Sequence, residues 1–184
     1  HRYPKGIEGE VAQALARVEK ILDRRFGAAD NPLLVSVRSG ARESMPGMMD
    51  TVLNLGLNDR TVQGLIQRTK NPRFVFDSYR RFIHMYADVV LGIKAASKTN
   101  GDPLAAILDR KKNARGARFD TDLDAADLQD LVCEYKAEIK KTLGKDFPED
   151  PMDQLWRAIG AVLGSWNNDR AIAYRELYQI PHDW

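Results

Sequence analysis

The chain has 184 residues, 43% of them hydrophobic and 8% aromatic, which is enough to bury the core of one domain or two small lobes. Its 28 Lys and Arg residues nearly balance 26 Asp and Glu residues and are interspersed with them, which argues against a nucleic-acid partner. No apolar run approaches the roughly 20 residues that a membrane-spanning helix needs, and no signal-peptide core follows His1, so we expect a soluble, cytoplasmic protein with no membrane partner.

The first predicted elements are a helix and a strand pair. Apolar residues recur every three or four positions from Ile7 to Phe26, which predicts an amphipathic helix that ends near Gly27. Residues 33–39 alternate in polarity and are rich in β-branched side chains, which predicts a strand that ends before Gly40. Residues 51–55 are a weaker strand candidate, expected to pair with the first strand across the loop between them.

Helical patterns dominate from Asn58 onward, with Asn58 or Asp59 as the predicted N-cap of the next helix. The helix after it carries an apolar stripe with aromatic side chains at helical spacing, which is more typical of packing than of a ligand cage. The members of this stripe are Phe76, Tyr79, Phe82, Ile83, Tyr86, Val89 and Val90. We therefore expect the stripe to form the core of the helical part.

The second half of the chain repeats one helix-start signal. An aspartate N-cap followed by a proline in the first turn occurs at residues 102–103 and 150–151. Between these starts, the basic run 110–118 is interpreted as a solvent-exposed connector, with phosphate binding as the less favoured alternative. A further helix is predicted over residues 124–144, and its Cys133 is expected to be a buried, unreactive thiol.

The last predicted helix is capped by Asn168 or Asp169 and ends before Pro181. Together the elements predict a mainly α-helical α+β protein with a small β component near the N-terminus. We expect a helical subdomain over residues 58–144, and we assign residues 1–57 and 145–184 to the other part of the fold.

The segment 35–51 is not explained by a helix pattern, and it holds the candidate binding residues. A strand brings Arg38 to its C-terminal end, and a guanidinium presents a fork of donors that matches phosphate oxygens. The small side chains of residues 39–41 let an anion approach the backbone amides. The equally favoured alternative is that Arg38 pairs with Glu43 or Asp50 and that the loop is only a connection.

The rest of this loop adds a turn and apolar side chains. Pro46 and Gly47 favour a tight turn in which the glycine takes a positive φ angle. Met48 and Met49 either lie against a nucleotide or fill a gap in the core.

Residues 31–41 read NPLLVSVRSGA, and residues 44–59 read SMPGMMDTVLNLGLND. Both runs resemble the N-terminal signature of the pyruvate phosphate dikinase family. The similarity extends over nearly the whole chain, through the segments 76–82, 119–123, 153–155, 165–171 and 180–184.

The resemblance implies one lobe of an ATP-grasp-like nucleotide-binding domain with a helical subdomain. It implies an enzyme that converts ATP, phosphate and pyruvate into AMP, diphosphate and phosphoenolpyruvate through a phosphohistidine on a swivelling domain, with ATP and Mg²⁺ required. It assigns ATP phosphate contacts to Arg38, and positions along the nucleotide site to Gly47, Met49 and Asp50. The implied partners are ATP and the rest of the enzyme, including the phosphohistidine carrier domain, in a homodimer.

Parts that the family carries are missing from this sequence, namely a glycine-rich lysine loop, the acidic magnesium ligands and the carrier histidine. His1, His84 and His182 lack the Thr-Ser-His context of that carrier, so no catalytic residue and no metal ligand is assigned. We expect an excised segment that is inactive alone. The alternatives are a related phosphoenolpyruvate synthase or glucan-water dikinase domain, and a non-catalytic helical interaction module.

Overall fold

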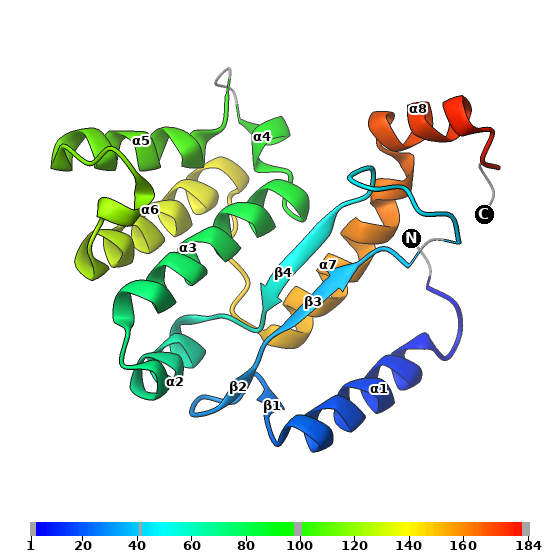
Figure 1. Cartoon of the computed structure of the whole chain (residues 1–184), viewed down its shortest axis with the longest axis horizontal. Helices are drawn as coiled ribbons and strands as arrows, with labels where there is room; N and C mark the ends of the chain where they lie inside the picture. Colours follow the sequence, from blue (N-terminus) through cyan, green and yellow to red (C-terminus); the bar gives the residue numbers. More distant parts are fainter. Residues whose placement is uncertain (1–2, 41, 98–100, 182–184) are drawn as a thin grey trace.

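The structure, a computed structural model, describes residues 3–40, 42–97 and 101–181 (Figure 1). Ala41, His1 and His182 therefore lie outside the described residues. The elements are α1 (Ile7–Leu22), β1 (Arg25–Phe26), β2 (Pro32–Leu33), β3 (Val35–Arg38), β4 (Thr51–Leu55), α2 (Asp59–Thr69), α3 (Pro72–Val89), α4 (Ile93–Ala96), α5 (Pro103–Arg115), η1 (Asp120–Asp122), α6 (Ala125–Leu143), α7 (Pro151–Gly164), η2 (Ser165–Asn167) and α8 (Asp169–Tyr178). Helices dominate and the strands are short, which confirms the predicted fold class.

The predicted strand over residues 33–39 is divided between β2 and β3. The strand β3 pairs with β4 in antiparallel fashion, as expected, and the register places Arg38 opposite Thr51. The shorter strands β1 and β2 form a separate parallel pair. A two-stranded sheet is marginal by itself, and this one is supported because α3 and α7 pack against β4.

The starts of α2, α5 and α7 follow the predicted capping signals. Asn58 accepts a hydrogen bond from the backbone N–H of Thr61 at 2.8 Å, which forms half of a capping box. Asp102 and Asp150 cap α5 and α7 in the same way, each ahead of a first-turn proline. The first helix is the exception to the predicted bounds, because α1 ends at Leu22 and not near Gly27.

The basic run was wrongly predicted as a connector. Residues 110–115 continue α5, which ends where Gly116 takes a φ of 63°. Lysine and arginine favour helices, and here they also meet acidic residues of α6: Arg110 pairs with Glu134, and Arg115 with Asp127. Only the last residues of the run connect two elements.

The prediction of a buried thiol at Cys133 is also wrong, since this side chain is exposed on α6. Leu131, Val132 and Tyr135 are buried on the core-facing side of that helix. Residue 133 falls between these positions in the helical repeat and so points away from the core.

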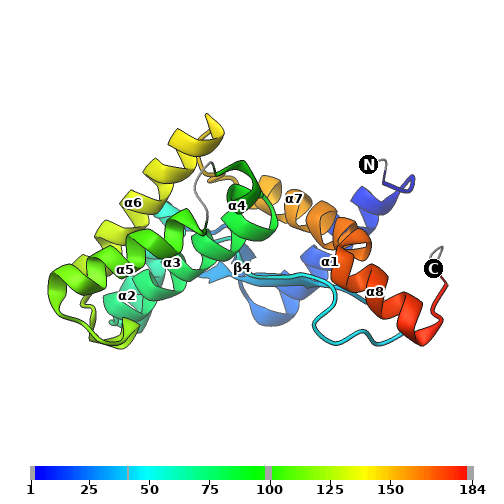
Figure 2. The same cartoon turned by 90° about the horizontal axis from the view of Figure 1, so that it is seen from above.

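The elements form two groups around the β3–β4 pair. Figures 1 and 2 show α2 to α6 together on one side, whereas α1, α7 and α8 lie on the other. A single hydrophobic cluster runs through both groups and includes Val52 and Leu55 of β4, Phe82 of α3, Ile139 of α6 and Leu155 of α7. The division into 58–144 against 1–57 and 145–184 stays a prediction.

A glycine in α2 marks a close backbone contact. A Cβ atom added to Gly64 would lie 1.8 Å from the carbonyl oxygen of Ala29, whereas one added to Gly9 of α1 would meet nothing within 4 Å. We expect Gly64→Ala to lower the free energy of unfolding by about 1 to 3 kcal/mol through overpacking. Gly9→Ala should raise it by about 0.5 to 1 kcal/mol, as alanine does in exposed helices. Urea denaturation measures both, and a stabilising Gly64→Ala would contradict the contact.

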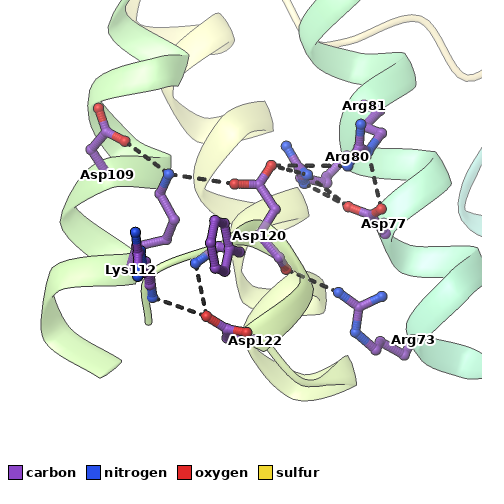
Figure 3. Close-up of polar contacts among 10 residues, drawn as sticks. Arg73, Asp77, Arg80, Arg81, Asp109, Lys112, Asp120 and Asp122 are labelled. Carbon is purple, nitrogen blue, oxygen red and sulfur yellow. Dashed lines mark hydrogen bonds and ion pairs between the residues drawn. The ribbon is translucent and has the colours of Figure 1, made fainter. Parts of the chain in front are cut away.

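Charged side chains join α3, α5 and η1 (Figure 3). The Arg80 side chain, only 4% exposed, donates to Asp77 Oδ1 and Asp120 Oδ2 at 2.7 Å each. Lys112 approaches the other oxygen of Asp120 at 3.4 Å. Desolvation alone would raise the pKa of Asp120, but the charge and hydrogen bonds of Arg80 and Lys112 outweigh it and lower that pKa.

This lowered pKa predicts an acid dependence of stability. The folded chain binds a proton at Asp120 less readily than the unfolded chain, so the stabilisation is complete above the ordinary aspartate pKa and is lost as the pH falls through the folded value. We expect Asp120→Asn to flatten the acid limb of a plot of unfolding free energy against pH. A variant curve parallel to that of the parent chain would contradict the role of Asp120.

Candidate functional site

Two adjacent pockets of about 590 and 620 Å³ meet at the end of β3. The residues that line both pockets are Arg38, Ser39, Gly40, Arg42, Glu43 and Met49. The first pocket is completed by apolar side chains of α7 and η2, including Leu163 and Trp166. The second is completed by the loop between β3 and β4, including Ser44 and Gly47, and by Thr51 of β4. One strand end therefore contributes to two recesses of different polarity.

Arg38 is exposed on this shared rim, opposite Thr51 of β4. The part of the chain that the structure describes provides no hydrogen bond or ion pair to its guanidinium. The structure pairs Arg38 with neither Glu43 nor Asp50, and the Asp50 carboxylate is bound by Arg170. An arginine that is held by a strand and has no ion-pair partner among the described residues is well placed to bind an anion.

Gly47 and Met49 shape the second pocket. Gly47 takes a φ of 74°, as predicted for the turn, and the N–H of Met48 donates to the carbonyl oxygen of Met45 at 3.1 Å. The Ser39 hydroxyl lies 2.9 Å from the sulfur of Met49. This contact joins the end of β3 to the far side of the loop.

Asp50 lies beside the pockets and does not line them. Its carboxylate accepts a hydrogen bond from Asn168 Nδ2 at 3.0 Å and pairs with Arg170, while its backbone N–H donates to Ser165 Oγ at 3.0 Å. The sequence prediction missed these three partners. The available signal was segment 165–171, one of the segments that carried the family resemblance.

Other reactive groups lie away from the pockets. His84 is partly buried on α3, and its Nε2 is 2.7 Å from Asp102 Oδ2. Within residues 3–40, 42–97 and 101–181, no group of three or more His, Cys, Asp or Glu side chains is arranged to hold a metal ion. No helix in this part of the chain is long and apolar enough to cross a membrane.

Residues 3–184 match the family described as "Pyruvate phosphate dikinase, AMP/ATP-binding domain". The chain belongs to this family. Among similar proteins, pyruvate, phosphate dikinase of Clostridium symbiosum is 49% identical over 179 residues, which cover 97% of this chain and 20% of that protein.

The similarity extends to other organisms. The Rhizobium meliloti dikinase is 50% identical over 98% of this chain, and the chloroplastic dikinase 1 of Arabidopsis thaliana is 46% identical over 97% of it. The chain spans about a fifth of the length of these relatives. The family predicted from the runs at 31–41 and 44–59 is thereby confirmed, and the pocket at Arg38 lies within the matched AMP/ATP-binding domain.

Proposed function

We propose that this chain is the part of a pyruvate phosphate dikinase that holds the ATP phosphates, with Arg38 as the main contact. The observation that carries the proposal is the exposed guanidinium of Arg38, which has no protein partner among the described residues and borders two pockets in an AMP/ATP-binding domain. The reaction of the whole enzyme would convert ATP, phosphate and pyruvate into AMP, diphosphate and phosphoenolpyruvate.

The residues around Arg38 suggest a division of roles. Its planar fork would bind two phosphate oxygens at once. Gly47 has open space at the position of a Cβ atom, so a ligand can approach the loop backbone there. Met49 borders both pockets with a polarisable apolar side chain that suits contact with a nucleotide. We assign Asp50 to the same site as a residue that fixes the position of this loop. Its carboxylate is already bound by Asn168 and Arg170 and does not line the pockets.

Other components of the reaction belong to the rest of the enzyme in this proposal. As the family resemblance implies, the metal ligands, the phosphohistidine carrier domain and the second lobe of an ATP-grasp-like clamp would lie elsewhere in the protein. Mg²⁺ neutralises phosphate charge when it is bound. A cytoplasmic location, expected from the composition, and a homodimeric assembly, implied by the family resemblance, complete the proposal.

Calorimetry with Mg-ATP tests this proposal. We expect the isolated 184-residue chain to bind weakly and to show no turnover, because one lobe leaves the base in water and the metal without carboxylates. The intact protein should bind ATP. Micromolar binding by the isolated chain would contradict the single-lobe assignment. The absence of binding by the intact protein would favour a helical interaction module instead.

A further inference from the structure

The loop between β3 and β4 is tied to a segment more than a hundred residues later in the chain. Arg170 of α8 donates from Nε to the carbonyl oxygen of Met48 at 3.0 Å, and its Nη2 pairs with the Asp50 carboxylate. Asn168 and Ser165 bind Asp50 as well, through its carboxylate and its backbone N–H. The backbone on both sides of Met49 is thus fixed from outside the loop.

The side chain of Asn168 departs from its usual local role. It is the N-cap residue of α8, where an asparagine normally accepts a hydrogen bond from the first turn, yet it makes no such bond. Its amide donates to Asp50 Oδ2 at 3.0 Å instead. A polar residue that gives up a local bond for a distant one indicates that the tertiary contact matters.

The Arg170 contact also differs from an ordinary surface ion pair. Its side chain is 50% exposed, and at that exposure an isolated pair contributes little. Arg170, however, bridges a backbone carbonyl and a carboxylate with two N–H donors, Nε and Nη2, of one planar group, which restricts the loop more than a single pair does. Among the described residues, Arg157 of α7 pairs with only one side chain, Asp153, at a similar exposure of 52%. It therefore serves as a matched control.

The contacts of Arg170 and Asn168 are connected to Arg38, the proposed ATP phosphate contact, through Met49 and Ser39. Met49 lies between the two fixed residues of the loop, and its sulfur contacts the Ser39 hydroxyl at 2.9 Å. Ser39 directly follows Arg38. We infer that Arg170 and Asn168 are positioning residues that hold Met49, and through it the end of β3, in the geometry that Arg38 needs to bind ATP phosphates. This inference rests on the proposed function.

The test uses the intact dikinase and two exchange reactions. For Arg170→Met we expect the kcat/KM of phosphate-dependent ATP–AMP exchange to fall roughly ten- to a hundredfold, the scale of a slightly misplaced binding group. Pyruvate–phosphoenolpyruvate exchange should stay within about twofold, because it does not use this site. Arg170→Lys should be intermediate, since lysine can pair with Asp50 but lacks the planar fork.

Hydrogen exchange provides a readout that is independent of activity. The backbone N–H of Asp50, which donates to Ser165, should exchange faster in Arg170→Met and Asn168→Ala than in the parent protein. Asn168→Ala removes no cap bond from α8, so the amides of that helix should keep their protection. Arg157→Met should change neither exchange reaction nor the Asp50 amide.

The outcomes separate this inference from the proposed function. If Arg38→Ala damages ATP–AMP exchange and Arg170→Met behaves like Arg157→Met, the positioning role is wrong and the function stands. Equal damage to both exchange reactions in Arg170→Met would show a general structural role and would also overturn the inference. If Arg38→Ala leaves ATP–AMP exchange intact, the proposed function fails and the inference fails with it.

Discussion

In the intact dikinase, Arg38→Lys is expected to lose most of the ATP- and phosphate-dependent exchange between ATP and AMP. Lysine keeps the positive charge but loses the planar fork that, in the proposed function, binds two phosphate oxygens. Arg38→Ala should lose more. A charge-assisted hydrogen bond contributes about 1.5 to 3 kcal/mol, so we expect a loss on the order of ten- to a hundredfold or more.

Arg17 provides the control for this substitution. It is an exposed arginine on α1 that does not line either pocket at Arg38. Arg17→Ala removes the same charge and should leave ATP–AMP exchange within about twofold, because exposed charges away from a site contribute little. Equal losses in Arg17→Ala and Arg38→Ala would mean that net charge, and not the Arg38 site, governs the exchange.

Phe82→Ala is expected to lower the free energy of unfolding by about 3 to 5 kcal/mol, the usual cost of removing a buried ring. Phe82 of α3 is fully buried, and its ring centroid lies 5.5 Å from that of Tyr86 and 5.8 Å from that of Phe147. The substitution would therefore leave a cavity between α3 and the segment that follows α6. Urea denaturation monitored by circular dichroism measures the change.

Phe74 of the same helix is the matched control, because its side chain is 56% exposed. Phe74→Ala should change the free energy of unfolding by less than about 1 kcal/mol, as most surface substitutions do. A near-neutral Phe82→Ala would mean that the aromatic stripe does not form the core. A large loss in both variants would mean that α3 tolerates no change on either face.

Local signals in the sequence predicted much of this fold. The starts of α2, α5 and α7 were found because Asn58, Asp102 and Asp150 cap their helices through nearby backbone N–H groups. The strand pair β3–β4 was predicted from β-branched residues on both sides of a loop rich in turn formers. The exposure of Cys133 was not predicted, although the spacing of its buried neighbours along the helix already places residue 133 on the outer side.

The contacts that complete the candidate site were less accessible to prediction. Arg38 and Gly47 stood out because their residue types suit an anion and a turn. The partners of Asp50, in contrast, lie 115 to 120 residues away in the sequence, at Ser165, Asn168 and Arg170. No periodicity or spacing specifies such a pairing, since it depends on how α7 and α8 pack beside the loop.

The most direct test of the central claim compares two exchange reactions in the Arg38→Ala variant of the intact protein. One is ATP–AMP exchange in the presence of phosphate, and the other is pyruvate–phosphoenolpyruvate exchange. If this chain holds the ATP phosphates through Arg38, the first reaction falls on the order of a hundredfold while the second keeps nearly its original rate. Unchanged ATP–AMP exchange, or equal damage to both reactions, would contradict the assignment of Arg38.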